Sequence, residues 1–120
     1  MTHILTVDDS ASMRQMVAFT LRDAGFDVSE AGDGAEGLSA AEQQRFDLVL
    51  ADVNMPVMDG ISLVRKLREL PSYRFTPVLM LTTEAGDDKK SEGRSAGATG
   101  WIVKPFNPEQ LLSTISRVLS

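Results

Sequence analysis

A short apolar run near the middle of the chain limits the possible folds most strongly. Residues 48–51 read Leu-Val-Leu-Ala without a polar interruption. This pattern indicates a strand buried on both faces of a parallel sheet, because a half-exposed strand would alternate apolar and polar residues. The run ends at Asp52, and Asn54 and Asp59-Gly60 follow as turn-forming residues. Ligands bind beyond the carboxyl ends of the strands in open α/β sheets, so we expect Asp52 to face a pocket.

Strand-like and helix-like segments alternate along the whole chain. The β-prone segments are residues 3–7, 26–30, 48–51, 78–81 and 101–103. Helices are predicted at about residues 13–24, 35–44, 61–70, 85–98 and 108–119. This alternation requires parallel strands joined by right-handed crossovers. The predicted fold class is therefore a doubly wound α/β domain, with a five-stranded parallel sheet and helices on both faces.

Capping residues mark the ends of two of these helices. Ser10 or Ser12 can cap the first helix, and Gly25 stands just past its end. Asn107 and Gln110 have the spacing of a reciprocal capping pair at the start of the last helix. These signals predict where the first helix begins and ends and where the last helix begins.

The composition narrows the class of protein. With 120 residues, the chain is expected to form one domain, residues 1–120. A net charge of −5 without a cluster of Lys and Arg argues against nucleic-acid binding. The absence of cysteine excludes a disulfide framework and a thiolate metal site. Because neither a signal-peptide pattern nor a run of membrane-spanning length is found, we expect a cytoplasmic protein that binds proteins or cations.

Polar residues stand at the ends of several predicted strands. Asp8 and Asp9 follow the first strand, Asp52 the third, Thr82 the fourth and Lys104 the last. Each alone could be a helix cap, a strand residue or a solvated charge, but if the first, third, fourth and fifth strands lie side by side, their ends bring all of these residues into one crevice. Carboxylates that share a crevice repel one another unless a cation neutralises them. Because the ligands are oxygens without His or Cys, the sequence favours Mg²⁺ over zinc.

A carboxylate beside Mg²⁺ can act as a nucleophile toward phosphorus and form an aspartyl phosphate. Asp52 is the predicted nucleophile because it stands alone on the central strand, whereas Asp8 and Asp9 form a pair suited to holding the ion. The ammonium group of Lys104 would neutralise the developing charge from the other side, and the hydroxyl of Thr82 would donate to a phosphoryl oxygen. The predicted chemistry is phosphoryl transfer.

These residues resemble the motif set of two-component response-regulator receiver domains. The matching motifs are Asp8-Asp9, Asp52 with Asn54-Met55-Pro56, Asp59-Gly60, Thr82 and Lys104-Pro105-Phe106. The resemblance covers the whole chain and is greatest to the stand-alone chemotaxis regulators of the family. Glu84, two residues after Thr82, matches their choice at that position. The resemblance implies a flavodoxin-like fold with strand order 2-1-3-4-5.

The resemblance also implies the chemistry of the site. A histidine kinase or a small phosphodonor would phosphorylate Asp52. Asp9, Asp52 and the backbone carbonyl of Asn54 would bind Mg²⁺ directly, and Asp8 would assist through water. Lys104 would pair with the phosphoryl group, and its bond to Pro105 is expected to be cis.

A conformational switch is implied in the same way. After phosphorylation Thr82 would move toward the new anion, and the aromatic residue at position 101 would occupy the vacated space. This chain has Trp101 where the family usually has Tyr or Phe, and Thr83 is bulkier than the residue often found there. The helix at 85–98 is rich in glycine and charge and is predicted to be the least stable. The face formed by residues 84–120 is therefore the predicted signalling surface.

The leading hypothesis is a monomeric, phosphorylation-controlled regulator, not an enzyme, that binds a flagellar motor switch or another chemotaxis partner. A phosphatase partner is also possible for such a protein. A phosphorelay shuttle or phosphate sink, paired with a histidine phosphotransfer domain, remains an alternative. A Mg²⁺-dependent phosphatase with an aspartyl intermediate would need an acid where Asn54 stands. A flavodoxin-like electron carrier is disfavoured because Asp8-Asp9 would repel a bound phosphate.

Overall fold

The computed structural model describes residues 2–55, 57–82 and 87–119, with the backbone alone described for residues 87–90. Three residues singled out from the sequence, Pro56, Thr83 and Glu84, lie outside the described residues, and so does the beginning of the predicted helix at 85–98.

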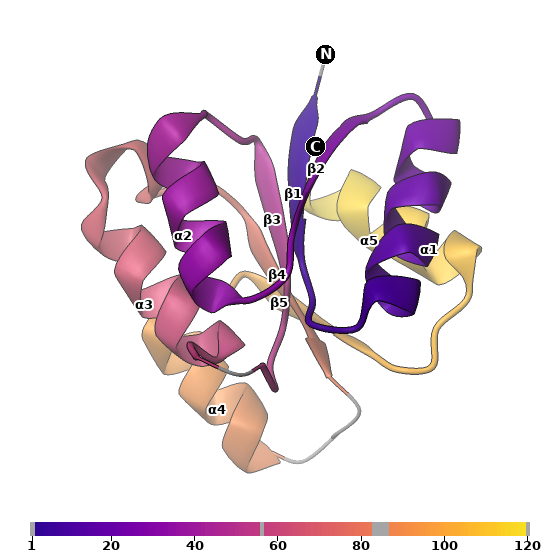
Figure 1. Ribbon diagram of the computed structural model, residues 1–120. Coiled ribbons are helices and arrows are strands. Elements are labelled where there is room, and N and C mark those ends of the chain that lie inside the picture. Colours follow the sequence, from indigo (N-terminus) through magenta and orange to yellow (C-terminus); the bar gives the residue numbers. More distant parts are fainter. Residues whose placement is uncertain (1, 56, 83–86, 120) are drawn as a thin grey trace.

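Strands and helices alternate as the sequence predicts (Figure 1). The strands are β1 (His3–Val7), β2 (Asp27–Ala31), β3 (Leu48–Asp52), β4 (Val78–Thr82) and β5 (Gly100–Val103). The helices are α1 (Ala11–Asp23), α2 (Gly34–Gln43), α3 (Gly60–Glu69), α4 (Asp87–Ala96) and α5 (Pro108–Leu119), with a short 3₁₀ turn, η1, at Pro71–Tyr73. All strand pairs are parallel, and their order is β2-β1-β3-β4-β5. The predicted fold class and strand order are confirmed.

The predicted boundaries differ from the observed ones by a few residues. β3 includes Asp52, which pairs in register with Leu81 of β4. β2 begins one residue later than predicted. The N-cap of α1 is Ser10 and not Ser12, because the Ser10 hydroxyl accepts a hydrogen bond from the backbone of Met13 at 3.3 Å. α4 ends at Ala96 because the next residue, Gly97, has a φ of +110°, which a helix cannot contain.

The sheet separates two apolar cores. α2, α3 and α4 cover one face of the sheet, and α1 and α5 cover the other (Figure 1). Successive residues of β3 point to opposite faces, so Val49 and Ala51 belong to the first core and Leu48 and Leu50 to the second. Burial on both faces is why this strand is apolar throughout until Asp52.

Arg68 of α3 attaches the end of α4 to the rest of the molecule. Its guanidinium group donates to the carbonyl of Gly97 from Nε at 3.1 Å and from Nη2 at 2.8 Å. Nη1 donates to the carbonyls of Tyr73 and Thr76, each at 2.6 Å. Among residues 91–96 of α4, only Gly93 and Ala96 are buried. The described part of α4 is thus held through small residues and through its carboxyl end.

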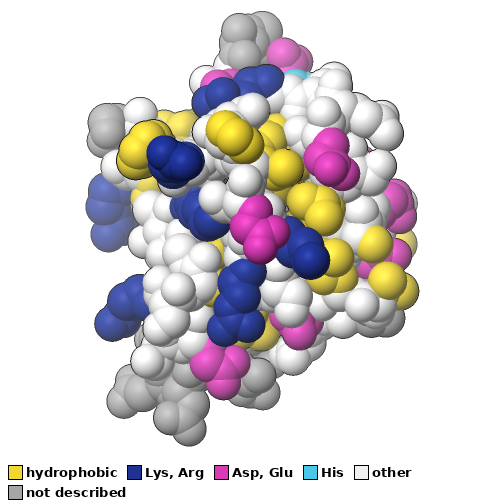
Figure 2. Space-filling model, turned by 90° about the vertical axis from the view of Figure 1, so that its left-hand side faces the viewer, with side chains coloured by type: hydrophobic (Ala, Val, Ile, Leu, Met, Phe, Trp, Pro, Cys, Tyr) yellow, Lys and Arg dark blue, Asp and Glu magenta, His cyan; other side chains and the backbone are white. Residues whose placement is uncertain are grey.

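The outer surface of α2, α3 and α4 is polar. Lys and Arg side chains are mixed there with Asp, Glu and uncharged side chains, and apolar side chains lie among them (Figure 2). No helix within residues 2–55, 57–82 and 87–119 combines the length and apolar character that crossing a membrane requires.

Candidate functional site

The strand order brings the polar strand-end residues to one edge of the sheet. β1, β3, β4 and β5 are consecutive neighbours, so their carboxyl ends lie side by side. Asp52 and Thr82 are the last residues of β3 and β4, whereas Asp8 and Lys104 directly follow β1 and β5. Carboxylate oxygens of Asp8, Asp9 and Asp52 lie within 4.8 Å of one another. The predicted acidic residues therefore do form a cluster.

Lys104 bridges two of the three carboxylates. Its Nζ lies 3.4 Å from Oδ2 of Asp8 and 3.2 Å from Oδ2 of Asp52. The site is largely removed from solvent, since Asp8 is 1% exposed and Asp52 is 8% exposed, whereas Asp9 is exposed. The peptide bond between Lys104 and Pro105 is cis, as expected. Lys104 thus offsets part of the negative charge of the three carboxylates.

Burial is the main influence on the pKa of the Asp52 carboxyl. It raises the pKa of the Asp52 carboxyl above its ordinary value, because the charged form loses hydration. The charge of Lys104 lowers this pKa, the charge of Asp8 raises it, and hydrogen bonds from Lys104 and the backbone of Asn54 lower it. The raised pKa remains after these opposing effects. Without a second cation, the ionised Asp52 is therefore held in an unfavourable environment.

The loop after β3 packs directly on the backbone of Asp52. A Cβ at Gly60 would lie 2.2 Å from the carbonyl oxygen of Asp52, so only glycine fits there. The Gly60 N–H donates to the carbonyl of Val53 at 2.9 Å, and the carboxylate of Asp59 caps α3 by accepting from the Ser62 N–H at 2.7 Å. These contacts fix both ends of the loop that contains Asn54.

The predicted switch residues lie on the β4 and β5 side of the site. Thr82 is fully buried, and its carbonyl accepts a hydrogen bond from the backbone of Lys104 at 2.7 Å. Trp101 packs against the core on the α4 face, and its ring is so close to Gly93 that a Cβ there would lie 2.2 Å from Cζ2 of the indole. The indole Nε1 is buried and has no hydrogen-bond partner among the described residues.

The donor set fits a hard divalent cation. The ligand atoms available in the cluster of Asp8, Asp9 and Asp52 are carboxylate oxygens, which Mg²⁺ prefers. The mutual proximity of these groups is costly while they are ionised, and Lys104 offsets part of this cost through its contacts with Asp8 and Asp52. The residues present therefore suit Mg²⁺, and Asn54, which is exposed at the same loop, can offer its backbone carbonyl.

Comparison with known proteins identifies the family. Residues 4–116 match the response regulator receiver domain. The chain is 40% identical to the chemotaxis protein CheY of Pseudomonas aeruginosa over 96% of this chain and 94% of that protein. The chain therefore belongs to the response regulator receiver domain family, whose CheY-like members are signalling regulators.

Solved structures agree with this assignment. The structure of chemotaxis protein CheY4 from Vibrio cholerae is similar, with a TM-score of 0.97, 57% identity and 99% of each chain covered. The receiver domain of the sensor histidine kinase PA1611 from Pseudomonas aeruginosa has a TM-score of 0.92 and 30% identity, and the match covers 98% of this chain and 97% of that one. That receiver has a magnesium ion coordinated in its active-site cleft.

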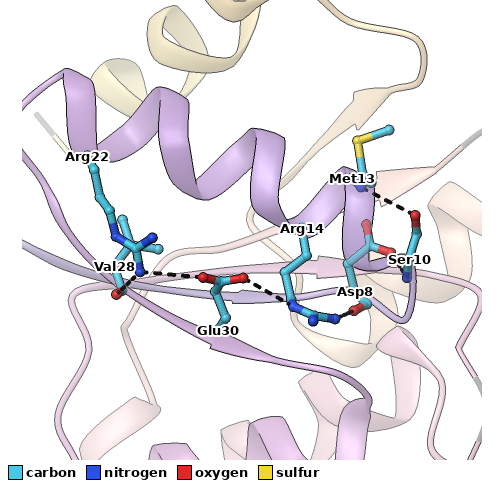
Figure 3. A network of polar contacts seen from close by, with 7 residues as sticks. All are labelled: Asp8, Ser10, Met13, Arg14, Arg22, Val28 and Glu30. Atoms are coloured by element: carbon cyan, nitrogen blue, oxygen red, sulfur yellow. Dashed lines mark hydrogen bonds and ion pairs between the residues drawn. The ribbon is translucent and has the colours of Figure 1, made fainter.

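Sequence reasoning missed the contacts that support the site from outside it. Arg14 of α1 donates from Nη1 to the backbone carbonyl of Asp8 at 2.8 Å and pairs with Glu30 of β2 (Figure 3). Gly93 was noted only as a helix-weakening residue, whereas the structure shows that it accommodates Trp101. The sequence did carry a signal for Arg14, because a cation stands near the start of a helix, where acidic residues are preferred.

We expect Asp52→Asn to stabilise the metal-free protein near pH 7. The native pKa of Asp52 is raised, so the native state binds more protons than the unfolded state between the ordinary and the native pKa, and stability falls as pH rises through that interval. Asp52→Asn lacks the carboxylate and should therefore not lose stability in this way. Its higher stability relative to the wild type should disappear below about pH 4, where Asp52 is protonated in both the native and the unfolded state. Thermal unfolding in EDTA from pH 4 to pH 8 measures the difference.

The matched control is Asp23→Asn, which removes the same charge from an exposed position on α1. Comparison with this variant separates the loss of a buried carboxylate from the loss of one negative charge. An Asp52→Asn protein that is less stable than the wild type at pH 7 would contradict the burial argument.

Proposed function

We propose that residues 1–120 form a single receiver domain of a chemotaxis-type two-component system, activated by phosphorylation of Asp52. The observation that carries this proposal is the buried Asp52 carboxylate beside Lys104 and within 4.8 Å of two further acids. A group in that setting combines a nucleophile with the charge neutralisation that phosphoryl transfer needs. The protein would act in the cytoplasm, receive its phosphoryl group from a histidine kinase and be no enzyme beyond assisting its own phosphorylation and dephosphorylation.

In the proposed reaction an oxygen of Asp52 attacks the phosphorus of phosphohistidine or acetyl phosphate. The bond from phosphorus to the donor breaks, and its electron pair leaves with the imidazole nitrogen, which takes up a proton, or with acetate. Lys104 would exchange its contact with the free carboxylate for one with a phosphoryl oxygen, and the hydroxyl of Thr82 would donate to another. The product is an acyl phosphate on Asp52.

Asp9, Asp52 and the carbonyl of Asn54 would hold Mg²⁺ directly, with Asp8 assisting through water. The bound ion would neutralise phosphoryl oxygens and relieve the repulsion among the carboxylates. Within the chain, Lys104 and the backbone of Asn54 orient Asp52, while burial keeps competing water away from it. Ion binding should also raise the midpoint of thermal unfolding, because it occurs only in the folded state.

The output would come from Thr82, Trp101 and the face formed by α4, β5 and α5. Movement of Thr82 toward the phosphoryl group would free space beside Trp101, whose ring now rests on Gly93 of α4. A shift of that ring would therefore change how α4 contacts the sheet. A groove of about 360 Å³ on the same face is lined in part by Trp101, Phe106 and Gln110. This face would bind the downstream protein.

Phosphorylation should depend on both Asp52 and Mg²⁺. Incubation with acetyl phosphate and Mg²⁺ should add one phosphoryl group to the wild type, as detected by intact-protein mass spectrometry. Asp52→Asn should abolish the addition, and Lys104→Ala should slow it by roughly a hundredfold because a preorganised charged donor is lost. Asp23→Asn serves as the charge-matched control that should react normally. Labelling that persists in Asp52→Asn would assign the nucleophile elsewhere.

The switch is testable with beryllofluoride, a mimic of the phosphoryl group. Together with Mg²⁺ it should change the hydrogen exchange of residues 87–100 and the fluorescence of Trp101. Gly93→Ala should displace the indole, so its emission should differ from that of the wild type before any ligand is added, and the response to beryllofluoride should shrink. Ser95→Ala, on the exposed side of α4, is the control.

An unchanged exchange profile at residues 87–100 would exclude this face as the responding surface. Unaltered emission of Gly93→Ala would show that Trp101 does not rest on Gly93 in solution.

A binding assay on the same samples identifies the kind of partner. Tighter binding of a flagellar switch peptide in the presence of beryllofluoride than in its absence would indicate motor control. Binding of a histidine phosphotransfer domain alone would indicate a phosphorelay shuttle or phosphate sink.

A further inference from the structure

A branched polar network connects α1 and β2 to the backbone of Asp8 (Figure 3). Arg14 donates from Nη1 to the carbonyl oxygen of Asp8 at 2.8 Å, and its Nε lies 3.2 Å from Oε1 of Glu30. The second oxygen of Glu30 lies 3.5 Å from Nη2 of Arg22, which also donates to the carbonyl of Val28 at 3.0 Å. Arg14 therefore connects the acidic site to an ion pair outside it.

The position of Arg14 is unfavourable for the helix that carries it. Arg14 is the fourth residue of α1 and lies close to the amino end of the helix, where the dipole favours anions and disfavours cations, and the first turn of α1 contains no acidic residue. Departures from local preference are expected where a site requires them. The contacts of Arg14 with Asp8 and Glu30 compensate for the unfavourable location, since both partners are acceptors.

Arg14 supplies one of the hydrogen bonds that hold the backbone and side chain of Asp8. The Asp8 N–H donates to the carbonyl of Ala31 at 3.1 Å, and Oδ1 of Asp8 accepts from the Ser10 N–H at 2.9 Å. With the Arg14 contact, the N–H, the carbonyl and the carboxylate of Asp8 each have a partner. The Asp8 carbonyl belongs to the planar peptide unit that also contains the nitrogen and Cα of Asp9. Holding this carbonyl therefore restricts the orientation of Asp9, whose side chain is exposed.

We propose that Arg14 is a positioning residue for the Mg²⁺ site. It acts through the Asp8–Asp9 peptide unit and holds the Asp9 carboxylate where it can share an ion with Asp52. Glu30 has a complementary role, because its charge offsets that of Arg14 and limits the repulsion between the guanidinium group and a bound cation. This inference rests on the proposed function in so far as that function places Mg²⁺ at Asp9 and Asp52.

Two substitutions distinguish positioning from a simple effect of charge. If Arg14 acts only as a nearby positive charge, Arg14→Gln should strengthen Mg²⁺ binding and Arg14→Lys should leave it unchanged. If Arg14 positions the peptide unit, Arg14→Gln should weaken binding. Arg14→Lys should weaken it as well, because a lysine ammonium lacks the planar fork that reaches Asp8 and Glu30 together. The two accounts therefore predict opposite signs for Arg14→Gln.

The experiment is a Mg²⁺ titration of the full chain followed by the amide signals of residues 7–11 in ¹H–¹⁵N spectra. This readout requires no phosphorylation. We expect the dissociation constant to rise about tenfold in Arg14→Gln, at the lower end of the effects known for groups that orient metal ligands. The amide signals of Asp9 and Ser10 should also shift in the metal-free variant.

Arg22→Gln is the matched control, because Arg22 is on the same helix and pairs with the same Glu30, whereas no contact joins it to Asp8 in Figure 3. Its dissociation constant should remain close to that of the wild type. Spectra report folding directly, and Arg14→Lys provides the test if Arg14→Gln is unfolded.

The outcomes separate this inference from the proposed function. Wild-type affinity in both Arg14 variants, or tighter binding in Arg14→Gln, would overturn the role of Arg14 and leave the proposed function intact. Equal weakening in Arg14→Gln and Arg22→Gln would also overturn it, since the effect would then not depend on the contact with Asp8. A wild-type protein whose signals at residues 7–11 do not respond to Mg²⁺ would overturn both proposals.

Discussion

The confinement of three carboxylates and one ammonium group at the edge of the sheet is the constraint on which the rest of the structure depends. Asp8, Asp9 and Asp52 approach one another within 4.8 Å, and Lys104 offsets part of their charge through contacts with two of them. Burial intensifies the repulsion and raises the pKa of Asp52. A site in this state gains stability from any group that supplies positive charge, so its occupancy is coupled to the conformation of the residues around it.

The surrounding elements hold this unfavourable arrangement in place. β3 is buried on both faces and delivers Asp52 to the edge, and Gly60 allows the following loop to lie against the carbonyl of Asp52. On the other side Arg14 and Ser10 hold Asp8. α4, in contrast, is attached through Gly93, Ala96 and the Arg68 contacts with Gly97. The molecule thus combines a site fixed by several contacts with a helix whose described part buries only the small residues Gly93 and Ala96. This combination suits a protein that reports the state of its site to a partner.

Local patterns in the sequence predicted the alternation of strands and helices, and the resemblance to receiver domains supplied the strand order, which the structure confirms. The proximity of Asp8, Asp9 and Asp52 followed from their positions at strand ends. What the sequence could not provide were contacts between distant residues that leave no local pattern. The pairing of Arg14 with Asp8 and Glu30, and of Arg68 with Gly97, depends on how helices pack on the sheet. The choice of Ser10 as cap likewise required the backbone itself.

The most direct test of this account is a crystal structure of the protein with Mg²⁺ and beryllofluoride. The account predicts beryllofluoride bonded to an oxygen of Asp52 and contacted by Lys104 and Thr82. It also predicts Mg²⁺ held by Asp9, Asp52 and the carbonyl of Asn54. Beryllofluoride bound to a different carboxylate, or a metal ion held without Asp52, would contradict the central claim that the crowded carboxylates at this edge form a phosphoryl-accepting site.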